Sequence, residues 1–76
     1  NQDLVKAVEW YSKAAEQGNS AGQHNLGCCF AFGEGVNQDY AKAVEWYSKA
    51  AEQGNAAAQN SLGFCCSNGQ GVKQDY

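Results

Sequence analysis

Two stretches of the chain carry apolar residues at the spacing of an amphipathic helix. In the first stretch the apolar positions form one helical face and an adjoining stripe: Leu4, Val8, Tyr11 and Ala15, then Ala7, Trp10 and Ala14. This wide apolar arc predicts an A helix that packs both on its own partner and on a neighbouring unit. We expect A helices over about Asp3 to Gln17 and about Asp39 to Gln53. No stretch alternates apolar and polar residues long enough to predict a strand.

A second helix, the B helix, is predicted directly after each A helix. Gly18 and Gly54 stand where a helix ends in a left-handed residue, and Asn19 and Asn55 follow as N-caps. Asp3 and Asp39 are the corresponding N-caps of the A helices. The B helices should extend to about Phe32 and about Asn68.

Each B helix contains a leucine followed by a glycine, at Leu26-Gly27 and at Leu62-Gly63. A glycine inside a helix costs about 1 kcal/mol relative to alanine. Its presence in both copies predicts a close backbone approach, against the tyrosine or tryptophan of an A helix. Gly33 and Gly35, with their copies Gly69 and Gly71, form the turn that closes each unit, where Val36 and Val72 are expected to fill the interface between units.

The helical pattern is written twice. The segment KAVEWYSKAAEQGN occupies Lys6–Asn19 and again Lys42–Asn55, an offset of 36 residues. Self-similarity at a fixed period is typical of solenoids, in which each unit buries its apolar face against the next. The sequence therefore predicts an all-α solenoid of antiparallel helix pairs, with units at residues 1–36 and 37–72 and the start of a third at 73–76. The chain is interpreted as part of a longer array.

From Leu26 onward the chain reads Leu-Gly-x-x-aromatic-x-x-Gly-x-Gly-Val, Asp-x-x-Lys-Ala-x-x-Trp-Tyr-x-Lys-Ala-Ala-Glu-Gln-Gly, then Ala-x-Gln-x-x-Leu-Gly. This pattern resembles the Sel1-like repeat, a relative of the tetratricopeptide repeat. The ordinary tetratricopeptide repeat has a period of about 34 residues, whereas the period here is 36. The resemblance covers essentially the whole chain. It implies a right-handed superhelix whose A helices line a concave face, and an adaptor function in assembling protein complexes. The second unit departs from the pattern, since Cys66 replaces the aromatic residue found at Phe30.

Composition narrows the class of partner. The 76 residues carry a net charge of −3 and a pI near 4.8, whereas nucleic acids and anionic membranes attract clustered Lys and Arg. No apolar run approaches the roughly 20 residues that span a bilayer. We therefore expect a protein or peptide partner, with neither nucleic acid nor membrane.

The cysteines form two adjacent pairs, Cys28-Cys29 and Cys65-Cys66. Neighbours on a helix project about 100° apart and do not form a relaxed disulfide. We interpret them as free thiols that pack like small apolar side chains, which favours a reducing compartment such as the cytoplasm, although the family resemblance also includes the secretory pathway. His24 precedes Cys28 by four residues, but its copy is Asn60, so a metal site is not predicted.

No cofactor and no enzymatic activity are expected, because the chain has one histidine and no set of nucleophile, base and orienting residue. The predicted function is that of a scaffold that presents a groove lined by the A helices. We define the A-helix strip as the candidate partner-binding residues Lys6, Glu9, Trp10, Lys13, Glu16, Lys42, Glu45, Trp46, Lys49 and Glu52. The alternative for the aromatic residues is packing in the core and between units.

A structural alternative is also open, in which these units are spacers within a solenoid whose recognition lies elsewhere. Nearly identical units favour it, because they carry little positional information. Units with uncapped apolar ends also predict end-to-end self-association.

Overall fold

The computed structural model describes residues 2–67, with side chains from residue 3 to residue 65. Four helices account for most of this part of the chain: α1 (Gln2–Glu16), α2 (Ser20–Phe32), α3 (Tyr40–Glu52) and α4 (Ala56–Ser67). Within these residues there is no strand, and the predicted all-α class is confirmed. None of the described helices has the length and hydropathy needed to cross a bilayer.

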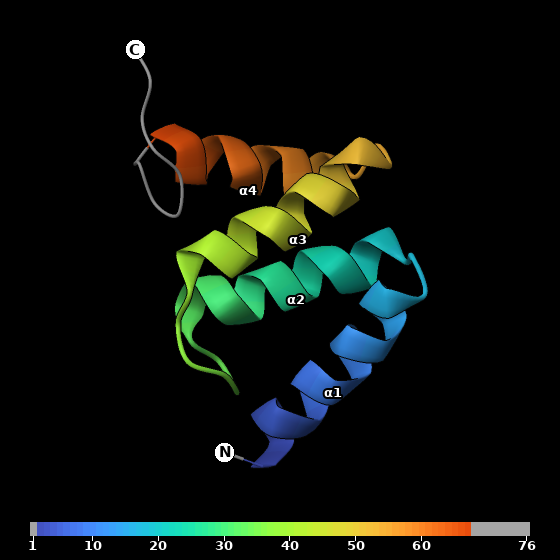
Figure 1. Ribbon diagram of the computed structural model, residues 1–76, viewed down its shortest axis with the longest axis vertical. Helices are drawn as coiled ribbons and strands as arrows, with labels where there is room; N and C mark the ends of the chain where they lie inside the picture. Colours follow the sequence, from blue (N-terminus) through green and yellow to red (C-terminus); the bar gives the residue numbers. More distant parts are fainter. Residues whose placement is uncertain (1, 68–76) are drawn as a thin grey trace.

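The helices stack in chain order. Each packs against the next, α1 on α2, α2 on α3 and α3 on α4, so that α1 and α4 form opposite ends of the stack (Figure 1). The molecule is elongated, with extents of 40 × 24 × 15 Å. Because α1 and α3 are the A helices and α2 and α4 the B helices, the arrangement is that of a helical repeat solenoid.

Side-chain caps fix where three of the helices begin. The side chain of Asn19 accepts a hydrogen bond from the backbone N–H of Gly22 at 2.9 Å, and that of Asn55 accepts one from Ala58 at 2.8 Å. Asp39 likewise accepts from Lys42 N–H at 3.2 Å. These three predicted N-caps are confirmed, and each satisfies a backbone donor that the helix leaves unpaired.

The prediction that Asp3 caps the first helix is wrong. Helix α1 begins at Gln2, one residue earlier, so Asp3 lies within the first turn, where its charge still complements the helix dipole. At the other ends of the A helices the predictions hold. Gly18 and Gly54 have φ angles of 86° and 87°, in the left-handed region.

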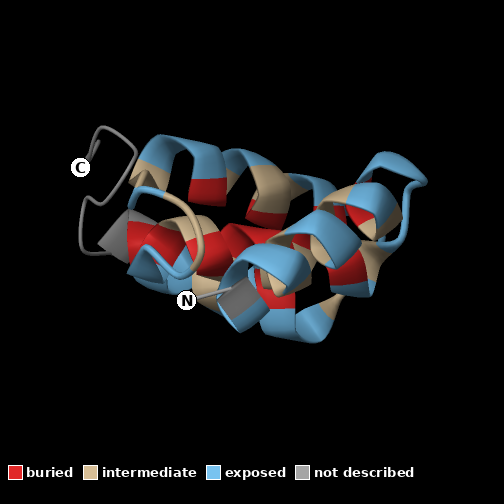
Figure 2. Cartoon of the chain, turned by 90° about the horizontal axis from the view of Figure 1, so that it is seen from below, coloured by how far each residue is buried: buried red, intermediate tan, exposed pale blue. Residues whose placement is uncertain are grey.

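Small side chains dominate the core. Figure 2 shows the buried positions gathered on the inner faces of the helices, with exposed residues outside. Among the described residues, five of the nine buried apolar side chains are alanines. The nine are Ala15, Leu26, Cys29, Ala31, Ala43, Tyr47, Ala50, Ala58 and Cys65. Alanine contacts let helix axes approach closely but bury little apolar area each. Stability must therefore depend strongly on the few large buried side chains, above all Tyr47 and Leu26.

The close approach predicted for the helix glycines occurs in one unit only. A Cβ atom placed on Gly27 would lie 2.7 Å from Cδ1 of Tyr47 and 3.2 Å from the carbonyl oxygen of Ala43. At Gly63, the repeat equivalent, such an atom would have nothing within 4 Å, so the prediction is wrong there. The reason is that Gly27 is covered by the following helix α3, whereas no described helix follows α4. The copies Gly69, Gly71 and Val72 lie outside the described residues.

Candidate functional site

The A-helix strip lies on the outer faces of α1 and α3. All ten of its residues are solvent-exposed except Trp46, which is half-buried. Its lysines and glutamates alternate along each helix, so the surface carries both signs of charge. The strip holds all four lysines of the described residues and an equal number of glutamates, so it is neutral, whereas the other charged residues of the described part are acidic.

In each A helix the tyrosine is more buried than the tryptophan beside it: Tyr11 is half-buried and Trp10 exposed, and Tyr47 is buried and Trp46 half-buried. Trp10 is 70% exposed, whereas Tyr47 is 2% exposed. The ammonium of Lys13 lies 5.8 Å from the centroid of the Trp10 ring, and that of Lys49 lies 4.6 Å from the Trp46 ring. Each is a cation–π pair at the surface. Core packing therefore describes Tyr47, while Trp10 belongs to the surface.

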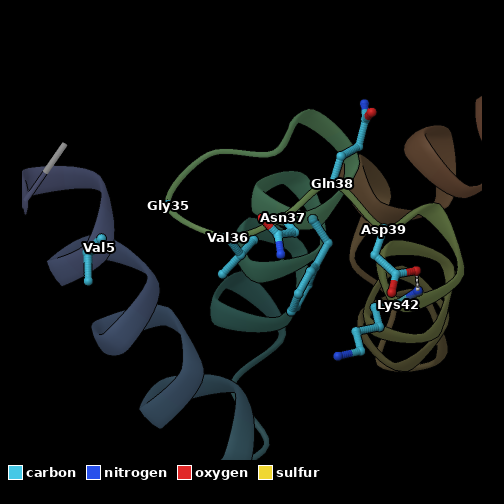
Figure 3. A pocket seen from close by; sticks show the side chains of 8 residues that line it. Val5, Gly35, Val36, Asn37, Gln38, Asp39 and Lys42 are labelled. Atoms are coloured by element: carbon cyan, nitrogen blue, oxygen red, sulfur yellow. Dashed lines mark hydrogen bonds between the residues drawn. The ribbon is translucent and has the colours of Figure 1, made fainter.

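A cavity of about 800 Å³ opens between α1, α3 and the connection from α2 to α3 (Figure 3). Its lining residues are Val5, Phe30, Gly35, Val36, Asn37, Gln38, Asp39 and Lys42. Val5 bounds the cavity on α1 and Lys42 on α3, so it joins the first turns of the two A helices. Lys42 is the one member of the A-helix strip in this lining. The structure therefore places the other nine outside it, along the two helices.

Charged and apolar groups meet within this cavity. The ammonium of Lys42 lies 5.4 Å from the ring centroid of Phe30, while the carboxylate of Asp39 is engaged in capping α3. Val5, Phe30 and Val36 supply apolar surface beneath these charges. The sequence interpretation did not place Val5 or Phe30 in a binding surface. A usable signal existed, because both differ from their repeat equivalents, Ala41 and Cys66.

The contacts of Tyr47 hold the two units together. Its hydroxyl donates a hydrogen bond to Sγ of Cys28 at 3.3 Å. Its ring lies 5.6 Å from the imidazole of His24, whose Nε2 is 3.4 Å from Oγ of Ser61 on α4. His24 thus lies between the two units. We call the contact surface of α2 with α3 the inter-repeat interface.

Two hydrogen bonds of Gln23 cross the same region. The amide of buried Gln23 donates to the carbonyl oxygen of Ala15 on α1 at 3.2 Å. The amide of Gln53, next to the end of α3, donates to Oε1 of Gln23 at 2.8 Å. Gln23 therefore connects both A helices through its single side chain, which satisfies a polar group that would be costly to bury unpaired.

A second cavity, of about 360 Å³, lies between α2, α3 and α4. Its lining is mainly apolar and includes Phe32, Tyr47, Phe64, Cys28 and Cys65. No disulfide joins Cys28, Cys29 and Cys65 to one another, and the side chain of Cys66 lies outside the described residues. Among the described residues, no three His, Cys, Asp or Glu side chains come together as metal ligands would.

Stability is expected to fall as the pH rises above about 9. Burial, with smaller effects of Glu34 and Cys28, raises the pKa of the Cys29 thiol above its ordinary value of 9.0. Burial, followed by the hydrogen bond to Cys28, likewise raises the pKa of the Tyr47 hydroxyl. The folded state holds both protons more tightly than the unfolded chain. This contribution is therefore fully present below pH 9.0 and is lost as the pH rises through the folded-state pKa values.

Urea unfolding at about pH 7 and about pH 10.5 measures this loss. In Cys29→Ala the thiol contribution is absent, so the decrease between the two pH values should be smaller. An unfolding free energy that is equal at both pH values would contradict the expectation.

Comparison with known proteins agrees with the sequence pattern and the fold. The family model of the Sel1 repeat matches residues 1–19, 20–55 and 56–76. A comparison with curated proteins yields no significant match.

Two crystal structures are closely similar. A Sel1 repeat protein from Oxalobacter formigenes shares 42% identity with a TM-score of 0.89, over 95% of this chain and 30% of that one. The protective antigen c5321 of uropathogenic Escherichia coli, which displays an SLR fold, shares 48% identity with a TM-score of 0.91, over 93% of this chain and 15% of that one. This chain thus spans less than a third of either relative.

Sel1 repeat proteins typically act as non-catalytic scaffolds for protein interactions. With the repeat model matched along its whole length and the fold shared with two solved relatives, the chain belongs to the Sel1 repeat family.

Proposed function

We propose that the chain is a protein-interaction scaffold and that the A-helix strip is its binding surface for a protein or peptide. The observation that carries this proposal is the 70% exposure of Trp10 on a surface of alternating charge. Exposing a large aromatic side chain to water is unfavourable, and tryptophan is enriched among residues that dominate binding energy at interfaces. A partner that covers Trp10 would bury this ring.

The chemistry of the strip suits a peptide or helix with charges of both signs. Lysines and glutamates lie within one turn of each tryptophan, so a partner can pair its charges around an aromatic anchor. The cavity beside Lys42 adds apolar surface next to a cation, which suits an acidic residue flanked by an apolar one. The net charge of −3 disfavours nucleic acid and anionic membranes as partners. We propose no catalytic activity and no cofactor.

Peptide binding is expected to require the tryptophans. Peptides selected from a random display library against the chain should bind at least about tenfold more weakly to the double variant Trp10→Ala, Trp46→Ala, because each anchor contributes on the order of 1–2 kcal/mol. Titration by isothermal calorimetry measures the loss. The two tryptophans also report binding to the unmodified chain directly, through their fluorescence.

Phe32→Ala is the matched control. Phe32 is 69% exposed, as Trp10 is 70% exposed, but it lies on α2, away from the strip. The selected peptides should bind Phe32→Ala as tightly as the unchanged chain. If the peptides bind Phe32→Ala more weakly but bind the tryptophan double variant with unchanged affinity, the binding site lies outside the A-helix strip. Charge reversal in the double variant Lys13→Glu, Lys49→Glu should lower the affinity for the same peptides.

A second candidate function is a structural spacer within a longer solenoid. The identity of Lys6–Asn19 and Lys42–Asn55 favours it, because two identical strips offer a partner the same chemistry twice. In this proposal residues 1–36 and 37–72 are complete units and 73–76 begin a third. A library that yields no peptide dependent on Trp10 or Trp46 would support the spacer over the scaffold. End-to-end self-association through the ends of the stack belongs to the same proposal.

A further inference from the structure

The thiol of Cys28 lies between a base and a hydrogen-bond donor. Cys28 follows His24 by one turn of α2, and its Sγ is 3.7 Å from Nε2 of the imidazole. The hydroxyl of Tyr47 donates a hydrogen bond to the same sulfur at 3.3 Å. In the imidazole tautomer that carries its proton on Nδ1, Nε2 is an acceptor, so the thiol hydrogen can point to His24 while the sulfur accepts from Tyr47. A base beside the sulfur is the arrangement that activates a nucleophilic cysteine.

Cys28 also lines the cavity of about 360 Å³ between α2, α3 and α4. This volume lies within the range of small-molecule sites, and the lining is mainly apolar, with Phe32 and Tyr40 among its residues. Ser61 contributes from α4, and its Oγ is 3.4 Å from Nε2 of His24. This wall is therefore the face of α4 that packs against α2. The site is formed by contacts inside the described stack and not by its outer faces.

Cys28 is the most accessible of the three cysteines whose side chains are described. It is half-buried, whereas Cys29 is 6% and Cys65 is 3% exposed. Cys65 lines the same cavity. Even so, no three His, Cys, Asp or Glu side chains of the described part converge as metal ligands would, which leaves the nucleophilic chemistry of the thiol as the feature to explain.

We propose that Cys28 is a site of covalent modification by α,β-unsaturated carbonyl compounds that carry an apolar chain. The thiol proton passes to Nε2 of His24, the sulfur forms a bond to the β carbon, and the electrons of the carbon–carbon double bond move toward the carbonyl oxygen. The proton then returns from His24 to the α carbon, and the product is a thioether. Every atom of both reactants is retained, so the step needs no leaving group, oxidant or metal.

The class of compound follows from what surrounds the sulfur. The apolar lining suits a hydrocarbon chain, while the polar side chains of Asn60 and Ser61 stand at the wall beside His24 and can receive one carbonyl group. The described residues that line the cavity include no Lys, Arg, Asp or Glu, so a charged compound would be buried there without a partner. This inference goes beyond the scaffold proposal, because none of the ten residues of the A-helix strip lines this cavity.

Two vinyl ketones that differ only in their alkyl chain test the proposal. Octyl vinyl ketone and methyl vinyl ketone carry the same reactive group, and the rate of each with N-acetylcysteine corrects for intrinsic reactivity. Adducts on the reduced chain are followed over time by mass spectrometry, and peptide fragmentation assigns them to individual cysteines. After correction, Cys28 should react at least about tenfold faster with the octyl than with the methyl compound, because burial of a few methylene groups is worth that factor.

Two variants separate the base from the cavity. His24→Asn introduces the residue that the chain already carries at the equivalent position, Asn60. It should slow Cys28 with both ketones at least about tenfold while leaving the ratio of the two rates unchanged. Phe32→Ala shortens a wall of the cavity and should lower that ratio severalfold while leaving the rate with methyl vinyl ketone unchanged. Circular dichroism confirms that each variant is folded.

Cys29→Ala is the matched control, because it removes the adjacent thiol of the same helix. It should leave the modification of Cys28 unchanged, whereas Cys28→Ala should abolish the reaction that depends on chain length. Equal corrected rates of Cys28 with the two ketones would overturn the proposal. The same conclusion would follow from chain-length dependence at another cysteine, or from a rate that His24→Asn leaves unchanged.

Discussion

Tyr47→Ala is expected to lower the free energy of unfolding by about 3–5 kcal/mol. The side chain is 2% exposed and is the largest in the buried cluster it forms with Ala31, Ala43 and Cys65. Its removal enlarges the cavity of about 360 Å³ that it lines between α2, α3 and α4, and takes away the hydrogen bond to Sγ of Cys28. The other fully buried members of this cluster are small, so none of them can replace the volume of the tyrosine ring. Urea unfolding followed by circular dichroism measures the loss.

Tyr11→Ala provides the matched control within the same chain. Tyr11 occupies the equivalent position of an identical segment but is only half-buried, so its replacement should cost about 1–2 kcal/mol. Tyr47→Phe separates the hydroxyl from the ring and should cost about 0.5–1.5 kcal/mol. Equal losses for Tyr11→Ala and Tyr47→Ala would contradict the conclusion that the inter-repeat interface carries much of the stability.

Local features of this fold could be predicted from the sequence because they depend on near neighbours in the chain. The helices, the caps at Asn19, Asn55 and Asp39, and the left-handed residues at Gly18 and Gly54 follow from residues within one turn. The repeat then implies that helices of the same sequence form the same contacts in each unit. The error at Asp3 has the same origin, because a helix end can shift by a residue at little cost.

The placement of the aromatic residues could not be predicted in this way. Trp10 and Tyr11 are adjacent and both fall within the wide apolar arc of the A helix. Which residue of such a pair faces the core depends on the direction from which the neighbouring B helices approach, and the packing of the stack sets that direction. The structure resolves it, with Tyr47 inside and Trp10 outside. The sequence alone therefore predicted Trp10 and Trp46 in the binding surface but left open whether the aromatic residues line that surface or the core.

Repeat identity was itself misleading at Gly63. Position 27 and position 63 carry the same residue, yet only Gly27 contacts a tyrosine. Contacts between units depend on the neighbouring helix, and among the described residues no helix follows α4. The cavity beside Lys42 was missed for a related reason, since Val5 and Phe30 come together only when α1, α2 and α3 are assembled.

Gly35→Ala is expected to lower the free energy of unfolding by about 2–5 kcal/mol, from two separate causes. Gly35 has a φ of 74°, a left-handed conformation that costs an L-residue about 1–2 kcal/mol. In addition, a Cβ atom there would lie 2.6 Å from the carbonyl oxygen of Leu4 and 2.8 Å from Cγ2 of Val8. Backbone cannot yield as a flexible side chain can, so the connection between α2 and α3 would have to move away from α1.

Gly18→Ala isolates the first cause. Gly18 has a φ of 86°, but a Cβ atom there would have nothing within 4 Å, so only the conformational cost of about 1–2 kcal/mol should appear. The difference between the two variants measures how tightly the connection packs on α1. The same packing shapes the cavity that Gly35 lines with Val5 and Lys42. Gly35→Ala should therefore also lower the affinity for any peptide that contacts this cavity. Gly18→Ala should bind the same peptide with unchanged affinity. Equal stability of the two variants would show that the connection is held by its own turn and not by α1.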